Sequence, residues 1–265
     1  MRQGKFCFPL SHVLFYQKRT KKVVVMDNKD KWNILAKKFD TYSGQIDPSA
    51  ADQMIIAWPI ILNEITIHRR NNNTQKILDY GCGAGGFCNL LHSEGFQVTG
   101  IDLSDRMIEI ARKNSPDAIT YFSGDLTTLK LEGKFGAISS SMVFQFLKNI
   151  ESYLQIFHSL LEKQGLIVFA VVSPDFVRRC ARDNIRYFDL DPPEDPKAAT
   201  IRINSDLAIP VYPRSEEEYK KLFAKFGFDF VSSHHPNFTK EFVEKYKWPL
   251  PWDTPEYLII TFRKI

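Results

Sequence analysis

The sequence is poor in cysteine and has no long apolar run. Its 265 residues include four cysteines, which form no C-x-x-C pair and no cluster with histidine at zinc spacing. A structural metal site and a disulfide framework are therefore not indicated, and a cytoplasmic location is expected. The longest apolar candidate, MIIAWPIIL at 54–62, is about half the roughly 20 residues of a membrane-spanning helix, so we expect no membrane span.

Most of the chain also lacks an excess of either charge. The net charge is +4, but residues 1–25 carry six basic side chains and no acidic one. The remainder holds 29 basic against 31 acidic side chains, which argues against a general nucleic-acid surface. Segment 1–25 fits a signal peptide poorly, because no small-residue cleavage site follows its apolar part. It is either a functional basic arm or, as we favour, a poorly ordered extension ahead of Met26.

No internal repeat is visible, and short apolar runs alternate with helical patterns. This alternation predicts an α/β fold with a parallel, doubly wound sheet. We expect strands at 76–80, 96–102, 118–125, 135–141, 166–173, 228–233 and 256–264. We expect helices at 47–68, 85–95, 104–115, 150–165 and 216–227. Residues 174–213 do not continue this alternation of strands and helices and are predicted to form an insertion over the sheet.

The stretch KILDYGCGAGG at 76–86 is the most informative motif. Gly81, Gly83 and Gly86 satisfy the G-x-G-x-x-G pattern of nicotinamide and flavin enzymes, although this pattern alone is weak. Asp79 stands two residues earlier, where a carboxylate would repel a pyrophosphate by about 1 to 4 kcal/mol at about 4 Å. It would attract an ammonium or sulfonium instead. The turn is therefore predicted to bind a cationic ligand rather than a dinucleotide.

Several motifs together resemble those of class I S-adenosylmethionine-dependent methyltransferases: DYGCGAG, IDLS, SGDL, FGAISSSMVFQFL, LLEKQGLIVFAV and PEYLIITFRK. The resemblance covers roughly residues 30–265. It implies a seven-stranded, doubly wound, mostly parallel sheet with an antiparallel last strand, N-terminal helices and an insertion after strand five. It also implies one methyltransferase domain at 26–265, with the insertion at 174–213 covering the substrate pocket.

The resemblance implies which residues bind the cofactor, S-adenosyl-L-methionine. Gly81 and Gly83 would lie against its methionyl part, with Asp79 near the ammonium and Ser141 below the fourth strand. The full implied set is Asp79, Gly81, Cys82, Gly83, Asp102, Leu103, Met107, Gly124, Asp125, Leu126 and Ser141.

The acidic residues after the second and third strands would bind the nucleoside. Asp102 would accept hydrogen bonds from both ribose hydroxyls. Asp125 would accept one from the adenine amine, and Leu126 would supply a backbone donor. Leu103 and Met107 would pack on the base or the sugar. Taken alone, Asp102 could equally support the following helix, and Asp125 could be a turn residue.

The implied activity is methyl transfer by in-line displacement, in which positioning and desolvation do most of the work. Phe144, Phe146, Tyr187 and Phe188 suggest a small aromatic or apolar acceptor. No catalytic residue is assigned: many small-molecule members carry histidine after strand four, where this chain has Gln145 and Phe146.

The sequence is also compatible with other functions. His234 and His235 follow a late strand, where a surface pair is the simpler interpretation than a catalytic base. The alternatives to a small-molecule enzyme are a tRNA or protein methyltransferase that docks through residues 1–25, and a binding protein without catalysis. A nicotinamide-dependent oxidoreductase would require that Asp79 has no effect on the ligand.

Overall fold

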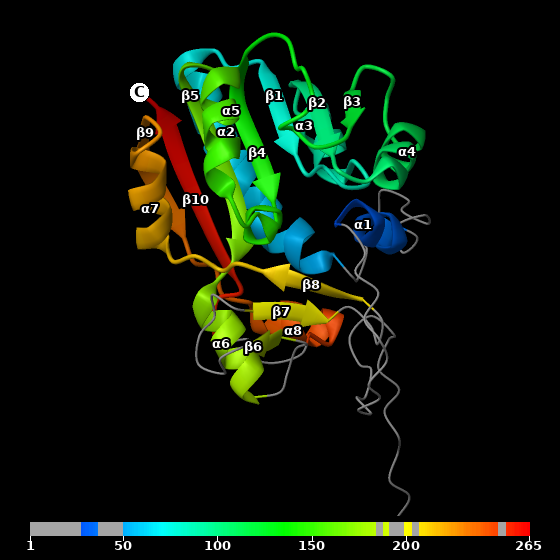
Figure 1. The fold of residues 1–265 in the computed structure, drawn as a ribbon, viewed down its shortest axis with the longest axis vertical. Helices are drawn as coiled ribbons and strands as arrows, with labels where there is room; N and C mark the ends of the chain where they lie inside the picture. The colour runs from blue at the N-terminus through cyan, green and yellow to red at the C-terminus, as the bar shows by residue number, and fades with distance from the viewer. Residues whose placement is uncertain (1–27, 37–49, 184–187, 191–198, 203–206, 249–252) are drawn as a thin grey trace, which may run out of the picture.

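The computed structural model describes residues 28–36, 50–183, 188–190, 199–202, 207–248 and 253–265. The predicted extension at 1–25 lies outside these residues. A seven-stranded sheet with the strand order β3-β2-β1-β4-β5-β10-β9 forms the centre (Figure 1). Its strands are β1 (Lys76–Tyr80), β2 (Gln97–Asp102), β3 (Thr120–Ser123), β4 (Phe135–Ser141), β5 (Leu161–Val172), β9 (Phe228–His234) and β10 (Tyr257–Lys264).

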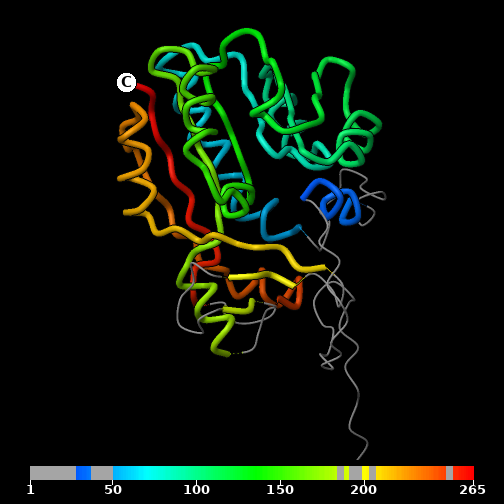
Figure 2. Tube along the Cα trace, viewed as in Figure 1, coloured from blue at the N-terminus to red at the C-terminus, as the bar shows by residue number. Residues whose placement is uncertain are grey.

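The pairing confirms the predicted doubly wound, mostly parallel sheet. β1 pairs in parallel with β2 and β4, and parallel pairing continues to β3 on one side and β5 on the other. β10 is antiparallel to both β5 and β9, and in Figure 2 it runs between them as the last strand of the chain. From β1 the chain adds β2 and β3 on one side, whereas β4 and β5 lie on the other side, so the strand order reverses between β1 and β4. Ligands of open α/β sheets bind outside the carboxyl ends of the strands at such a switch point.

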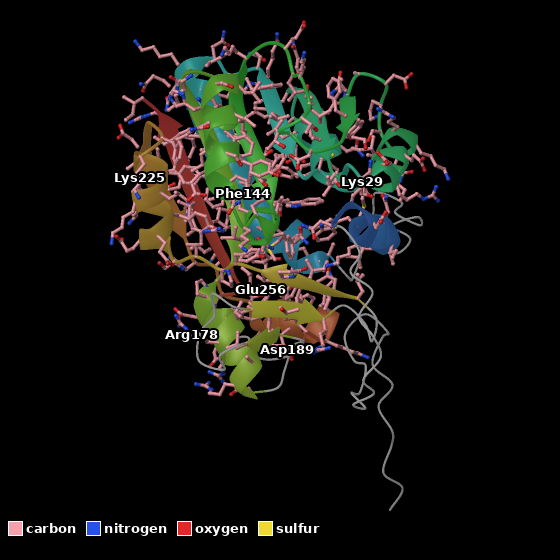
Figure 3. The ribbon with its side chains drawn as sticks, viewed as in Figure 1. Lys29, Phe144, Arg178, Asp189, Lys225 and Glu256 are labelled. Atoms are coloured by element: carbon pink, nitrogen blue, oxygen red, sulfur yellow. The ribbon has the colours of Figure 1, made fainter. Side chains whose placement is uncertain are left out.

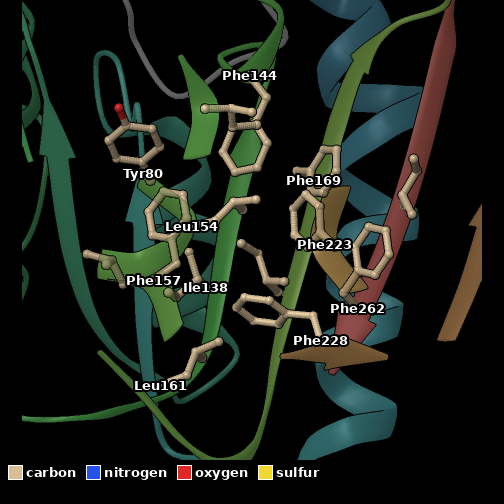
Figure 4. Packing of buried hydrophobic residues seen from close by; sticks show 14 of the residues in the cluster. Tyr80, Ile138, Phe144, Leu154, Phe157, Leu161, Phe169, Phe223, Phe228 and Phe262 are labelled. Carbon is tan, nitrogen blue, oxygen red and sulfur yellow. The ribbon is translucent and has the colours of Figure 1, made fainter. Parts of the chain in front are cut away.

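Helices cover both faces of this sheet. They are α2 (Trp58–Asn72), α3 (Gly86–Ser93), α4 (Asp105–Lys113), α5 (Ile150–Leu160) and α7 (Glu216–Ala224). α2, α3 and α4 contribute to one apolar cluster, which includes Ile61, Phe87 and Ile108. α5 and α7 contribute to the other, in which the rings of Phe157 and Phe223 pack with residues of the sheet (Figure 4). β5 is therefore buried on both faces from Gly165 to Val172, whereas the edge strands β3 and β9 each expose part of their length.

The predicted helix at 150–165 is too long. α5 ends at Leu160, and β5 begins at once because Leu161 pairs with Phe135 across the sheet. The register then shifts, and regular pairing resumes at Leu166. The Lys264 ammonium donates to the carbonyl oxygens of His158, at 2.7 Å, and of Leu161, at 2.9 Å. This cation satisfies the end of the helix, which sequence periodicity could not reveal because the partner lies about a hundred residues away.

Two helices after β5 were not predicted, although each begins with a recognisable cap. α6 (Pro174–Asp183) follows Ser173, whose hydroxyl accepts from the Phe176 N–H at 3.3 Å. α8 (Lys240–Tyr246) follows Thr239, whose hydroxyl accepts from the N–H of Phe242 at 3.1 Å. Both sequences, S-P-D-F and T-K-E-F, carry the Ser or Thr that helix starts prefer.

The predicted insertion forms a second sheet after α6. Its strands, in the order β6-β7-β8, are β6 (Phe188–Leu190), β7 (Ala199–Arg202) and β8 (Ala208–Val211), and both pairings are antiparallel. In Figure 1 this sheet and α1 (Asn28–Ala36) lie on the side toward which the arrowheads of β1 and β4 point. Among the helices of the described part of the chain, none has the length and apolar character of a membrane span.

Candidate cofactor site

The glycine turn connects β1 to α3 at the carboxyl edge of the sheet. Its backbone is held by β2, because the Gly81 and Cys82 N–H groups both donate to the carbonyl oxygen of Ile101, at 2.7 and 2.9 Å. Gly81, Gly83 and Gly85 have φ angles of 76°, 53° and 85°. These lie in the left-handed region, which glycine enters without the steric penalty of a side chain.

Gly81 and Gly83 are required for different reasons. A Cβ atom at Gly81 would lie 2.1 Å from Cγ2 of Val143, so this glycine lets the turn pack against the segment after β4. A Cβ atom at Gly83 would meet no atom of the described residues within 4 Å. The backbone of Gly83 therefore borders open space, which suits close approach of a ligand.

Asp79 is buried within β1. The Ser139 hydroxyl donates to its Oδ1 at 2.8 Å, and the Cys88 thiol donates to its Oδ2 at 3.4 Å. Burial raises the pKa of Asp79 to about 6, and the bonds from Ser139 and Cys88 oppose this rise. The carboxyl is thus an interior group with 3% exposure rather than one at the mouth of the turn. Its predicted contact with an ammonium stays a prediction.

Asp102, at the end of β2, joins the glycine turn to the next helix. Its Oδ2 accepts from the N–H of Gly83 at 2.9 Å, and its Oδ1 accepts from the N–H of Ser104 at 2.8 Å. Burial raises the pKa of Asp102, while both N–H groups favour its charged form. Asp102 therefore does support the start of the following helix, which is the alternative that the sequence left open. Each carboxylate oxygen can still accept a further bond, so a role toward a ribose is compatible with this geometry.

α1 docks on the start of α4 beside this carboxylate. Ser104 caps α4 by accepting from the Met107 N–H at 3.1 Å, and its hydroxyl donates to Oδ1 of Asn33 at 2.6 Å. Lys29, labelled in Figure 3, forms an ion pair of 2.7 Å with Asp105. The buried Met107 side chain lies in a small apolar cluster with Ala36, Ala84 and Ile110. The sequence did not reveal this role of α1, because the contacts join residues about 70 positions apart.

Asp125 follows β3 and is held by two elements. Its Oδ1 accepts from the N–H and the hydroxyl of Thr127, both at 2.8 Å. The Tyr153 hydroxyl on α5 lies 3.2 Å from Oδ1 and 3.1 Å from Oδ2. Gly124, with φ 133°, donates its N–H to the Asp102 carbonyl at 2.9 Å and so links the two acidic positions. The Leu126 side chain is buried in the core, which leaves its backbone for any ligand contact.

The remaining predicted residues differ in exposure. The Ser141 hydroxyl donates to Oε1 of Gln53 at 3.2 Å, and Leu103 is half-buried next to Asp102. Cys82 is buried, and burial raises the pKa of its thiol well above its usual range, so it is no activated nucleophile. Among the described residues, no group of three or more His, Cys, Asp or Glu side chains could hold a metal ion.

The aromatic residues that suggest an acceptor pocket do not all lie in one cluster. Phe144 is a core residue, with its ring stacked on Phe169 at 4.4 Å between centroids (Figure 4). Phe188 packs in the cluster of the small sheet, and Tyr187 lies outside the described residues. Phe146 packs against the same cluster as Phe188, and its ring also contacts Trp32 of α1, with 5.0 Å between centroids.

The two late histidines have carboxylate partners. His234 Nε2 lies 2.9 Å from Glu64 on α2, and His235 Nε2 lies 3.0 Å from Glu216 at the start of α7. Glu64 also accepts from the Ser232 hydroxyl at 3.0 Å. These contacts hold β9 and its following loop against two helices, which supports the structural interpretation of this pair.

Comparisons with known proteins identify the family to which the chain belongs. A family model described as a methyltransferase domain matches residues 50–233. The malonyl-[acyl-carrier protein] O-methyltransferase of Priestia megaterium is 28% identical over 145 residues, which are 54% of this chain and 50% of that protein. An uncharacterized protein of Haemophilus influenzae is 31% identical over 151 residues, or 58% of its length. The chain thus spans about half the length of these curated relatives.

A solved structure shows the same fold. Magnesium protoporphyrin IX methyltransferase from Synechocystis, with bound S-adenosylhomocysteine, superimposes with a TM-score of 0.59 at 15% identity. The superposition covers 89% of this chain and 98% of that protein.

Proposed function

Because the chain belongs to the family of methyltransferase domains, we propose that it transfers a methyl group from S-adenosylmethionine to a small apolar or aromatic acceptor. The observation that carries this proposal is the open space over Gly83, bordered by Asp102 and positioned at the switch point of the sheet. A nicotinamide dinucleotide is the weaker candidate, because the family model that matches the chain is that of a methyltransferase domain.

Three parts of the chain would hold the cofactor. The glycine turn offers a backbone that a methionyl group can approach, with buried Asp79 supplying negative charge nearby. Asp102 would accept from the ribose hydroxyls while it keeps the Gly83 and Ser104 N–H groups paired. Asp125 would accept from the 6-amino group of the adenine.

When bound, S-adenosylmethionine supplies a methyl group on a positively charged sulfur. The protein's part is to hold the acceptor in line and to exclude water, since proximity alone contributes roughly 7 to 11 kcal/mol in well-oriented reactions. An apolar cluster joins α1 to the small sheet. Its members are Trp32, Leu35, Phe146, Leu207 and Ile209. The presence of this apolar cluster favours the proposal that the acceptor has apolar character.

The acceptor class is tested by a labelling experiment. The purified protein is incubated with methyl-labelled S-adenosylmethionine and a cell extract, which is then separated into small molecules, RNA and protein. We expect the label in the small-molecule fraction, and expect Asp102→Ala to reduce it. Label in RNA or protein would contradict the small-acceptor proposal while supporting methyl transfer. Absence of transfer to any fraction by a protein that binds the cofactor would identify a binding protein instead.

The buried carboxyl of Asp79 makes cofactor binding depend on pH. With a pKa of about 6, only about one tenth of this group is ionised at pH 5, whereas nearly all of it is ionised at pH 8. An ammonium beside it favours the ionised form, so the affinity for S-adenosylhomocysteine should be about tenfold higher at pH 8 than at pH 5. Asp79→Asn should remove most of this difference in calorimetric titrations.

A control variant and the pH dependence of stability distinguish Asp79 from other carboxyl groups. Asp105→Asn should keep the pH dependence, because hydrogen bonding to Lys29 holds the pKa of Asp105 below its usual range. Without ligand, the folded state binds the Asp79 proton more tightly than the unfolded state. This group therefore lowers the free energy of unfolding as the pH rises from about 4 to about 6. An equal pH dependence in wild type and Asp79→Asn would contradict the ammonium contact.

A further inference from the structure

The carboxylate of Asp125 has two unequal oxygens. Oδ1 accepts from the N–H and the hydroxyl of Thr127, both at 2.8 Å, and lies 3.2 Å from the Tyr153 hydroxyl. Within the described part of the chain, Oδ2 has one partner, the same Tyr153 hydroxyl at 3.1 Å. A carboxylate oxygen can accept two bonds. Oδ2 is therefore the atom with capacity for a ligand donor, and the Tyr153 hydroxyl is the contact that fixes where it points.

Tyr153 is itself held in place by the core. Its ring packs against Tyr80, with centroids 5.8 Å apart, and against Phe157, with centroids 6.5 Å apart. Tyr80 is the last residue of β1, directly before the glycine turn, and the Ser140 hydroxyl donates to its carbonyl oxygen at 2.8 Å. Figure 4 shows the Tyr80 ring beside the Phe157 ring. Tyr153 thus contacts the candidate site at two places, through Tyr80 before the glycine turn and through Asp125 after β3.

The protonation state of Tyr153 suits a donor. Burial and the nearby Asp125 charge raise its pKa to about 12, so the hydroxyl keeps its proton at neutral pH. A hydrogen bond from a neutral phenol to a carboxylate is a charge-assisted one, which is stronger and more directional than a neutral pair. The Tyr153 hydroxyl lies within hydrogen-bond distance of both Oδ1 and Oδ2 and so fixes the orientation of the carboxylate plane, while Thr127 fixes the position of Oδ1.

We propose that Tyr153 is a positioning residue that aims Oδ2 of Asp125 at an exocyclic amine, and so sets the preference for a 6-amino purine over a 6-oxo purine. This inference rests on the proposed function, because it takes the Asp125 site to be the base subsite. An amine donates to a carboxylate oxygen, whereas a 6-oxo group is a second acceptor and leaves the remaining acceptor capacity of Oδ2 without a donor. A carboxylate free to rotate would avoid part of this mismatch.

The test compares two ligands that differ at one position of the base. Calorimetric titrations use S-adenosylhomocysteine and S-inosylhomocysteine, in which a 6-oxo group replaces the 6-amino group. Tyr153→Phe removes only the hydroxyl, and should weaken binding of the adenine ligand about threefold to tenfold, which corresponds to one hydrogen bond. Binding of the inosine ligand should not weaken, because the freed carboxylate can turn away from the 6-oxo group, so the ratio of the two affinities should shrink by at least the same factor.

Two further variants separate the possible failures. Tyr219→Phe also loses a buried hydroxyl, in a ring that packs against Phe169 and Phe223, and should leave both affinities unchanged. Asp125→Asn replaces one acceptor with a donor and should collapse or reverse the preference for the adenine ligand.

Each remaining outcome decides between the two proposals. Equal weakening of both ligands by Tyr153→Phe would indicate a general structural role and overturn the inference. If Asp125→Asn collapses the ratio and Tyr153→Phe does not, only the inference fails. If Asp125→Asn leaves the ratio unchanged, the base assignment within the proposed function fails as well.

Discussion

Gly83→Ala should abolish most cofactor binding while the protein stays folded. The added methyl group would enter the open space over the turn, where overpacking costs about 1 to 3 kcal/mol. We therefore expect the affinity for S-adenosylhomocysteine to fall by about tenfold or more. The φ angle of 53° adds a cost of about 1 to 2 kcal/mol to the free energy of unfolding, because alanine enters the left-handed region unfavourably.

Two other glycines provide controls for this result. Gly133 has a φ of 93° and, like Gly83, a Cβ position with no atom of the described residues within 4 Å, but it lies in the loop before β4. Gly133→Ala should therefore lower stability to a similar degree and leave affinity unchanged. Gly81→Ala should destabilise the protein more than either, because its Cβ would collide with Val143. Unchanged affinity in Gly83→Ala would show that the ligand does not approach this turn.

Asp102→Ala should impair both affinity and stability. Removing the carboxylate takes away the acceptors for the ribose hydroxyls, and each bond to a charged group contributes about 1.5 to 3 kcal/mol. Affinity for S-adenosylhomocysteine should fall by tenfold or more. The N–H groups of Gly83 and Ser104 also lose their acceptor, so the free energy of unfolding should fall by about 2 kcal/mol. Calorimetry with ligand and denaturant unfolding without ligand measure the two effects separately.

Two variants control the Asp102 result. Asp102→Asn keeps one acceptor oxygen and should be intermediate in both measurements. Asp117→Ala removes an exposed carboxylate after α4 and should change neither. A loss of stability in Asp102→Ala with unchanged affinity would reduce Asp102 to its observed local role, and would also weaken the other contacts proposed for the nucleoside.

The sequence predicts the sheet well because its signals are local. β1 and β4 begin and end where their apolar runs do, at 76–80 and 135–141. A local capping box also starts α7, since the Ser215 hydroxyl accepts from the Glu218 N–H and the Glu218 carboxylate accepts from the Ser215 N–H. Such features depend on residues a few positions apart, so pattern and spacing are sufficient to find them.

The parts that the sequence missed depend on distant partners. α5 stops early because Leu161 pairs with Phe135 and because Lys264 binds the carbonyl oxygens at its end. The docking of α1 through Asn33 and the hold of Tyr153 on Asp125 join elements far apart in the chain. For the site, motif spacing locates Asp79 in the correct strand, but only the fold shows that its carboxyl is buried between Ser139 and Cys88.

The most direct test of the central claim is a thermal unfolding series of the wild-type protein with S-adenosylhomocysteine and with NAD. At 100 times its dissociation constant, a ligand that binds only the folded state adds about 2.7 kcal/mol to the free energy of unfolding. The proposed cofactor site predicts a clear rise in melting temperature with S-adenosylhomocysteine and none with NAD. Stabilisation by NAD with no response to S-adenosylhomocysteine would contradict it.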